Sequence, residues 1–255
     1  MHDQVAPDRS TTILAGRVVV ITGASRGLGA GMARTFGEHG LKLGLCARHE
    51  PVPSIPTTVD VVTAAVDVGD AVAMQGFASR VAERLGPIDL WINNAGVLGP
   101  IGPLRDLDPI EVASNLRINL LGVVHGSQVF IRHRHEVGPG GVLVNISSGA
   151  ASHGYAGWSA YAAAKAGVER LTEVIRLEED ASGLRAYAVS PGVIDTDMQA
   201  QVRASTPEQF PEVERFQRLH REGRLRPPAH VAEFLLRLAF DPTHADDRVA
   251  LRVPD

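Results

Sequence analysis

Tyr161 and Lys165 are the residues whose types and spacing best suit acid–base chemistry. They stand four residues apart in a strongly helical segment, so both side chains lie on one face of a helix. A free tyrosine has a pKa of about 10, and a neighbouring ammonium favours the phenolate. Such a phenol can give a proton to a carbonyl oxygen, or accept one in the reverse reaction. The spacing therefore predicts an acid–base tyrosine whose pKa is lowered by Lys165.

Ser148 stands just past a predicted strand, thirteen residues before Tyr161. Residues 141–147 form a short apolar run without polar alternation, which suits a strand buried on both faces. A hydroxyl at the carboxyl end of such a strand faces the crevice in which α/β sheets bind ligands. We therefore expect Ser148 to hold a substrate oxygen beside Tyr161.

A glycine-rich turn, residues 22–29 (TGASRGLG), lies between a predicted strand and a predicted helix. Glycine is needed where the backbone turns tightly and approaches a pyrophosphate, while the helix N-terminus supplies amide donors. The spacing G-x-x-x-G-x-G is looser than the common dinucleotide fingerprint. The placement favours a dinucleotide site, and a plain structural turn is the alternative.

Arg48 follows the second predicted strand, at the point where NAD-preferring sites carry an acidic residue that binds the adenosine ribose. The first carboxylate after this strand is Glu50. A guanidinium at Arg48, with Arg26 in the glycine turn, favours a 2′-phosphate by charge and bidentate geometry. These residues predict NADPH, with NAD as the alternative; the competing interpretation is that both arginines are solvated surface residues.

Two further strand ends carry residues suited to the adenosine half of a cofactor. Asp67, after the third strand, is placed to bond the adenine amino group, or to cap a turn. Asn94, Ala95 and Gly96 follow the fourth strand, where small residues let the adenosine lie against the backbone. A strand-terminating turn is the alternative interpretation of this second stretch.

Short apolar runs alternate with amphipathic segments along the chain. Strands are predicted at 18–22, 41–47, 61–66, 89–93, 141–147, 184–190 and 248–253, and helices at 28–39, 71–85, 109–136, 158–180 and 229–240. This alternation predicts a single-domain α/β fold, a Rossmann-type doubly wound parallel sheet of about seven strands with helices on both faces. Residues 1–15 are predicted to be a flexible extension preceding the domain at 16–255. Residues 51–56 hold three prolines and are predicted to form a loop, and 192–228, with a helical piece near 212–222, a mobile substrate lid.

Composition narrows the function classes. The 255 residues carry a formal net charge of −4, which argues against a nucleic-acid partner. The single cysteine, Cys46, excludes an internal disulfide, and neither a signal-peptide core nor an apolar run of membrane-spanning length occurs, so a cytoplasmic protein without a membrane partner is expected. The ten histidines offer no H-E-x-x-H pattern, and no metal site is predicted.

The glycine turn, NNAG at 93–96, the strand-end serine and YxxxK, in this order, resemble the short-chain dehydrogenase/reductase family from Gly16 onward. The resemblance implies that Ser148 orients the carbonyl, Tyr161 is the acid–base group, and Lys165 binds the nicotinamide ribose and lowers the tyrosine pKa. It implies that Asn119, in INLLG, holds a water of the proton relay. It also implies a homodimer or homotetramer formed through the helices at 109–136 and 158–180. The implied cofactor contacts are Gly23, Ser25, Arg26, Gly27, Leu28, Gly29, Arg48, Asp67, Val68, Asn94, Ala95, Gly96, Tyr161, Lys165, Pro191, Gly192, Ile194 and Thr196.

Within that family the second half resembles the sepiapterin reductases and their bacterial relatives, some of which reduce aromatic diketones. The residues that carry this are VNISS at 144–148, the Gly157–Trp158 pair, LEE at 177–179 and PGVIDTDMQ at 191–199. Ala250 stands where the pterin-binding members carry an anchoring aspartate, so a broader carbonyl substrate is expected. Trp158, three residues before Tyr161, is either a core residue or the wall of an aromatic pocket.

These features predict an NADPH-dependent carbonyl reductase that transfers a hydride to a ketone, diketone or aldehyde, a small-molecule substrate, with Tyr161 as proton donor. One alternative is an NAD(P)-dependent alcohol dehydrogenase working in the oxidative direction. Another is a non-catalytic NADP(H)-binding regulatory protein, which would not need Asn119, Ser148, Tyr161 and Lys165 together.

Overall fold

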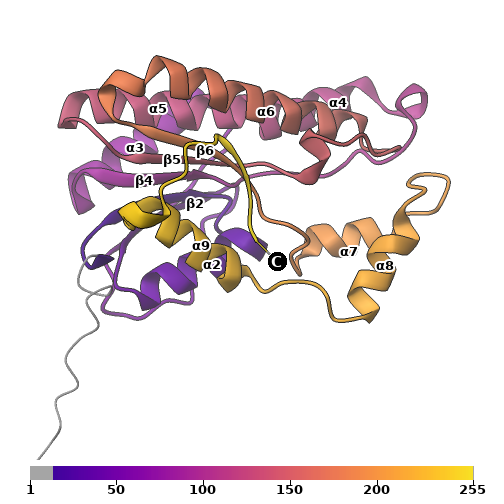
Figure 1. The fold of residues 1–255 in the computed structure, drawn as a ribbon, viewed down its shortest axis with the longest axis horizontal. Helices are drawn as coiled ribbons and strands as arrows, with labels where there is room; N and C mark the ends of the chain where they lie inside the picture. The colour runs from indigo at the N-terminus through magenta and orange to yellow at the C-terminus, as the bar shows by residue number, and fades with distance from the viewer. Residues whose placement is uncertain (1–13, 255) are drawn as a thin grey trace, which may run out of the picture.

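A seven-stranded parallel sheet forms the centre of the molecule (Figure 1). The computed structural model describes residues 14–254. The strands are β1 Val18–Thr22, β2 Lys42–Ala47, β3 Val61–Ala65, β4 Ile88–Asn93, β5 Val142–Ile146, β6 Arg185–Ser190 and β7 Ala250–Arg252. Their order is β3-β2-β1-β4-β5-β6-β7, which confirms the predicted doubly wound sheet. The order reverses between β1 and β4, the place where such sheets open a ligand crevice at their carboxyl ends.

Helices cover both faces of the sheet. On one face lie α2 Gly27–Glu38 and α9 Pro228–Phe240; on the other lie α3 Ala71–Leu85, α4 Pro109–Leu116, α5 Gly122–Val137 and α6 Ser159–Glu178 (Figure 1). The strands between them are apolar because both of their faces are covered. In β1, Val19 and Ile21 pack on the α2–α9 side, and Val18 and Val20 on the other side. The prediction of a Rossmann-type fold is thereby confirmed.

The helix predicted at 109–136 differs from the observed one. It is divided into α4 and α5 by a π-helical turn, Arg117–Leu121, whose Asn119 is fully buried. Asn119 and Asn115 both bond the main chain of the loop after β4, which draws this turn toward the sheet. A π turn accommodates one extra residue and commonly marks a functional site. The last predicted strand is also shorter than expected, at Ala250–Arg252.

Two irregular segments follow the expectations in part. Residues 51–60 form no helix, as their prolines predict. Residues 192–228 contain α7 Asp197–Arg203, which the sequence did not reveal, and α8 Val213–Arg221, which matches the expected helical piece. Both helices stand apart from the two helical layers, at the right of Figure 1. The segment leaves and rejoins the domain at one point, where Ile194 bridges to Arg226.

Most of the predicted N-terminal extension, residues 1–13, lies outside the described residues. Between residues 14 and 254, no helix has the length and apolar character needed to cross a bilayer. The same part of the chain has no group of three or more His, Cys, Asp or Glu side chains arranged to hold a metal ion.

Candidate active site

A crevice of about 1120 Å³ runs along the carboxyl ends of the strands, from the glycine turn and the end of β2 to the N-terminal half of α6. Residues 192–228, the segment predicted to be a lid, contribute part of its wall. Every residue predicted for cofactor binding lines this crevice, as do Ser148, Tyr161 and Lys165. Asn119 does not line it. Residues far apart in the sequence are therefore brought to one site, as the fold requires.

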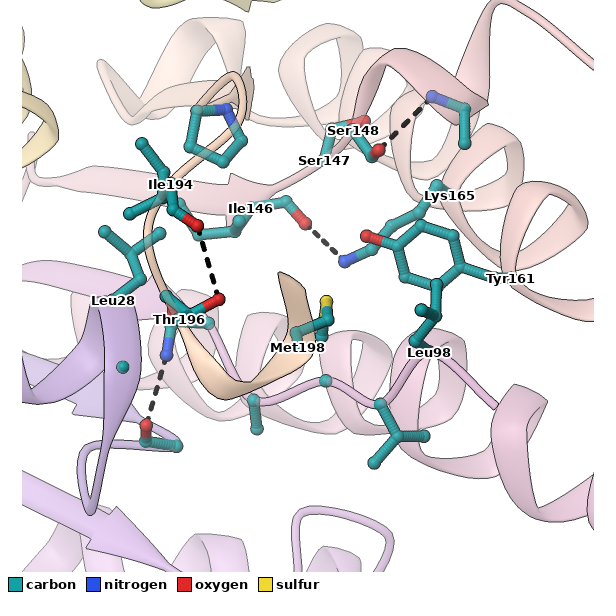
Figure 2. A pocket seen from close by; sticks show the side chains of 18 of the residues that line it. Leu28, Leu98, Ile146, Ser147, Ser148, Tyr161, Lys165, Ile194, Thr196 and Met198 are labelled. Carbon is teal, nitrogen blue, oxygen red and sulfur yellow. Dashed lines mark hydrogen bonds between the residues drawn. The ribbon is translucent and has the colours of Figure 1, made fainter. Parts of the chain in front are cut away.

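The two α6 residues sit side by side and are almost completely buried. Tyr161 and Lys165 are 7% and 4% exposed, and the Lys165 Nζ lies 5.6 Å from the centre of the Tyr161 ring (Figure 2). Nζ donates a hydrogen bond to the main-chain oxygen of Ile146, at the end of β5, over 2.7 Å. Ser148 begins the short helical turn Gly149–Ala151; its Oγ accepts from the Ala150 amide over 3.2 Å and the hydroxyl also bonds Tyr161. Ser148, Tyr161 and Lys165 are thus brought together.

Burial sets the charge state of this group. It raises the pKa of Tyr161, and the hydrogen bond from Ser148 lowers it by less. Burial also lowers the pKa of Lys165 to about 8. Both shifts favour the neutral forms, because a buried ion loses its hydration. The net shift of the Tyr161 pKa is upward, opposite to the predicted direction, because burial of the phenol is the largest cause. The phenol is held protonated.

The Asn119 side chain is fully buried and forms all its hydrogen bonds within the protein. Its Oδ1 accepts from the Val97 amide over 3.0 Å, and its Nδ2 donates to the Val97 oxygen over 2.8 Å and to Asn115 Oδ1 over 2.9 Å. Both amide hydrogens are therefore used within the protein. The side chain holds the loop after β4 in place. That Asn119 holds a water remains a prediction, and the water would have to bind an atom of Asn119 other than its amide nitrogen.

The glycine turn packs directly on the loop after β4. Gly23 has φ +68°, and a Cβ placed there would lie 2.7 Å from the Ala95 Cα, so only glycine fits. Asn94 Nδ2 donates to the oxygens of Thr22 and Gly23, over 2.9 and 3.3 Å. Asn94 and Ala95 thus brace the turn as well as lining the crevice. The α2 helix starts at Gly27, so its N-terminal amides open on the same space.

The charged residues predicted near the adenosine have mixed settings. Arg48 is exposed at the end of β2 and lines the crevice. Arg26 lies with its Nη1 3.2 Å from Asp197 Oδ2, at the start of α7, so it contacts the lid. Asp67 accepts from Arg117 Nη2 and from the Gly69 amide, and the Arg117 bond lowers its pKa. Its carboxylate is therefore already engaged within the protein, as in the turn-capping alternative.

An aromatic cluster closes the other end of the crevice. Trp158 stacks on Phe210 with ring centres 4.5 Å apart and planes within 3°. Tyr155 and Phe216 lie 5.0 and 5.6 Å from the same ring. Trp158 is 5% exposed and lines the crevice, so it is both a core residue and a wall. The sequence pointed to Trp158 by its distance from Tyr161, but no periodic pattern linked it to the lid rings.

A buried polar chain that the sequence did not reveal holds α6 against the sheet. Asn93 Nδ2 donates to Asn145 Oδ1 over 2.8 Å, joining β4 to β5. Asn145 Nδ2 in turn donates to Thr172 Oγ1 of α6 over 2.9 Å. Such satisfied buried networks fix the relative position of the elements they join. This one fixes the helix of Tyr161 relative to the strand that leads to Ser148.

Comparison with known proteins places this geometry in a family. The family model described as short chain dehydrogenase matches residues 17–207. A benzil reductase ((S)-benzoin forming) of Bacillus cereus is 32% identical over 233 residues, 87% of this chain and 93% of that protein. A cis-4-hydroxycyclohexanecarboxylate dehydrogenase of Sinomonas cyclohexanicum is 34% identical over 236 residues, 89% of this chain and 90% of that protein. The crystal structure of levodione reductase matches with a TM-score of 0.81 at 28% sequence identity. The match covers 93% of this chain and 95% of the levodione reductase chain.

The chain belongs to the short-chain dehydrogenase family. It is an oxidoreductase of a family that binds NAD(P)(H). The prediction of an enzyme is confirmed, and the alternative of a non-catalytic regulatory protein is set aside.

Proposed function

We propose that the protein is an NADPH-dependent carbonyl reductase in which Tyr161 protonates the substrate oxygen. The observation that carries this is the buried Tyr161 phenol, whose pKa burial raises, beside the Ser148 hydroxyl at the end of a crevice that starts at the glycine turn. A proton donor is required when a carbonyl oxygen becomes a hydroxyl. A phenol kept neutral by burial suits reduction better than oxidation.

The crevice fits a nicotinamide dinucleotide. Its glycine turn brings the backbone and the N-terminus of α2 to one side, where a pyrophosphate would bind. Pro191, Gly192, Ile194 and Thr196 line the part nearer Tyr161 and would hold the nicotinamide half. A nicotinamide bound there supplies the hydride. Lys165 would hold the ribose, since its Nζ lies beside Tyr161 and is fixed by Ile146.

The residues around the substrate oxygen divide the work. Ser148 and Tyr161 both present hydroxyl hydrogens to it, which fixes its position and polarises the carbonyl. As the carbon is reduced, the Tyr161 hydroxyl gives up its proton to the oxygen. The Lys165 ammonium, with a pKa of about 8, carries charge at neutral pH and stabilises the phenolate left behind. A water held by Asn119 would then return a proton to the Tyr161 phenolate.

Arg48 supports NADPH rather than NADH. It is the residue directly after β2, where a 2′-phosphate would lie, and it lines the crevice. The first carboxylate after β2, Glu50, accepts a hydrogen bond from Thr63 Oγ1 over 2.5 Å and does not line the crevice. Arg26 would join Arg48 on the phosphate by leaving Asp197, since that ion pair is exposed and weak.

The substrate end supports an aromatic or other apolar carbonyl compound. Four aromatic rings gather there in a chain that is only 5% aromatic. The benzil reductase relative acts on an aromatic diketone, which makes benzil the first substrate to try. Ala250, exposed on β7, offers no carboxylate to a pterin. Residues 192–228 would act as the lid, since Phe210 and Phe216 pack on Trp158.

Oxidation of a cyclic alcohol is the second candidate function. The dehydrogenase relative named for cis-4-hydroxycyclohexanecarboxylate favours it. The two candidates differ in direction: the reductase consumes NADPH with a ketone, whereas the dehydrogenase reduces NAD⁺ or NADP⁺ with an alcohol. Initial rates in both directions at neutral pH distinguish them.

Assembly and location complete the proposal. Ile110, Leu121, Val174 and Leu177 are large apolar residues exposed on α4, the π turn and α6. We propose that they meet the same face of a second copy, giving a homodimer or homotetramer. A cytoplasmic location is supported by the presence of a single cysteine, Cys46, which cannot form an internal disulfide.

The test of the proposed function is an absorbance assay on the purified protein. NADPH and NADH are each mixed with benzil, a simple diketone and sepiapterin, and the loss of reduced cofactor is followed. We expect turnover of benzil with NADPH, and little of sepiapterin. Absence of carbonyl-dependent NADPH oxidation across this panel would contradict the proposal.

A further inference from the structure

The Trp158 indole N–H is a buried hydrogen-bond donor without a partner among the described residues. The residue lines the crevice and is 5% exposed. An indole nitrogen can only donate, and buried donors in native proteins nearly always have an acceptor. Leaving one unpaired costs free energy, which a ligand oxygen would return on binding. A residue of the crevice wall thus carries a buried donor for which the described residues offer no acceptor.

Trp91 shows that this fold does satisfy an indole N–H where no ligand is involved. Trp91 is fully buried between the helices and the sheet, and its Nε1 donates to Asn93 Oδ1 over 2.8 Å. These are the two tryptophans of the chain. The one remote from the crevice is paired, and the one in the crevice wall is unpaired.

Trp158 is placed to reach an oxygen close to the reacting one. It directly precedes α6, and its ring centre lies 5.9 Å from that of Tyr161, at 79° between the planes. An oxygen held by Tyr161 and a second oxygen one carbon further on would both lie in the space that these two rings border. The second oxygen is a carbonyl acceptor, which is the partner that an indole donor requires.

We propose that the Trp158 N–H donates a hydrogen bond to the non-reacting oxygen of a vicinal dicarbonyl substrate and so selects such compounds over simple ketones. The inference rests on the proposed function, because it assigns a second contact to the same substrate. A site that hydrogen-bonds a substrate group discriminates strongly against analogues that lack the group. Trp158 is therefore a specificity-determining residue.

The lid explains how this donor is kept from water. Two of the rings against Trp158, Phe210 and Phe216, belong to the lid segment. The substrate oxygen reaches the N–H when this segment lifts, and the closed rings then exclude water from the hydrogen bond, which strengthens it. Gln199 of α7, which also lines the crevice, has a buried amide oxygen without a partner, so unpaired polar atoms occur on the lid side as well.

The first test observes the indole hydrogens directly. With ¹⁵N-labelled protein, the spectrum holds two indole N–H signals, and Trp158→Phe identifies which is which. NADP⁺ has no hydride to transfer, so the complex of protein, NADP⁺ and benzil does not react and can be observed. We expect the Trp158 signal to move downfield with benzil and less with deoxybenzoin, which has the same two rings and one carbonyl. The Trp91 signal should stay in place. A bound benzil that leaves the Trp158 signal unmoved would overturn the proposal.

The second test compares the same two ketones kinetically. Trp158→Phe keeps an aromatic ring to stack on Phe210 but removes the N–H. We expect the ratio of kcat/KM for benzil to that for deoxybenzoin to fall roughly tenfold. Phe210→Leu is the matched control, since it removes the stacked ring and keeps the donor, and should leave the ratio unchanged. Where deoxybenzoin is not turned over, its inhibition constant against benzil takes the place of its kcat/KM.

The outcomes separate this inference from the proposed function. If wild-type protein reduces benzil and Trp158→Phe leaves the ratio unchanged, the role of Trp158 is wrong and the reductase remains. If wild-type protein reduces no carbonyl compound, the proposed function itself fails. Near-native melting temperature and NADPH affinity of Trp158→Phe confirm that the variant is folded. If it is not, the wild-type spectrum decides without assignment: one indole signal that moves with benzil supports the proposal, and two signals that stay in place overturn it.

Discussion

The Lys165 Nζ donates its hydrogen bond to the main-chain oxygen of Ile146, 2.7 Å away, at the end of β5. This bond ties the acid–base helix to the strand that leads to Ser148. Burial raises the pKa of the Tyr161 phenol beside it. The lysine and the tyrosine are therefore positioned as a unit with the sheet edge, before any ligand arrives.

The reductase should lose activity as Lys165 loses its proton. Burial lowers the pKa of this amine to about 8, so it is an ammonium below that pH and neutral above it. We expect kcat/KM for NADPH, which reports the free enzyme, to be flat through neutral pH and to fall above about pH 8. Tyr161 stays protonated there because burial raises its pKa. Lys165→Met should abolish this fall along with most of the activity. A wild-type profile that stays flat well above pH 8 would show that the ammonium is not needed.

Arg48→Asp should reverse the cofactor preference. The guanidinium favours a 2′-phosphate, and an aspartate at the end of β2 would repel it and accept from a ribose hydroxyl instead. We expect KM for NADPH to rise at least about tenfold while KM for NADH falls. Arg80→Asp is the control, because it makes the same charge change on the exposed surface of α3. Equal effects of the two substitutions on both cofactors would remove Arg48 from the phosphate site.

Asn145→Ala should destabilise the protein and loosen the site. The substitution removes the shortest of the hydrogen bonds that Asn93 Nδ2 donates, leaving longer ones to Ser127 and Val123, and it removes the donor to Thr172 Oγ1, all in the buried core. We expect a loss of about 2 kcal/mol, which lowers the melting temperature by roughly 4–8 °C. Gln75→Ala, on the exposed face of α3, is the control and should change it little. Thermal unfolding followed by circular dichroism measures both; equal melting temperatures would mean that the polar chain contributes nothing.

Leu177→Glu should dissociate the proposed assembly. Leu177 is 79% exposed on α6, and a carboxylate there would be buried against a second copy without a partner. We expect light scattering after gel filtration to show a lower mass for this variant. Val52→Glu, at a residue 96% exposed in the loop after β2, should keep the wild-type mass. A monomeric wild-type protein would contradict the assembly directly.

The sheet and the position of the site were predictable from the sequence because both depend on local patterns. Apolar runs alternating with helical segments define a doubly wound sheet. Ser148 follows a strand of this sheet, Tyr161 and Lys165 lie in the next long helix, and the fold brings the two elements together at the carboxyl edge. The direction of the Tyr161 pKa shift was not predictable, since it depends on how completely the fold buries the ring.

Contacts between segments far apart in the chain could not be predicted from the sequence either. Arg26 pairs with Asp197, and Trp158 stacks on Phe210, across stretches with no shared periodicity. The polar chain through Asn93 and Asn145 is hidden for a similar reason, because asparagine in an apolar strand gives no sign of its partner on another strand.

The most direct measurement is the reduction of benzil by the Tyr161→Phe variant with NADPH. This substitution removes one hydroxyl and keeps the ring that packs against Trp158. If Tyr161 supplies the proton, kcat/KM falls about 100-fold or more while the dissociation constant for NADPH stays near the wild-type value. If the variant reduces benzil at the wild-type rate, the proton comes from another group and the proposed mechanism is wrong.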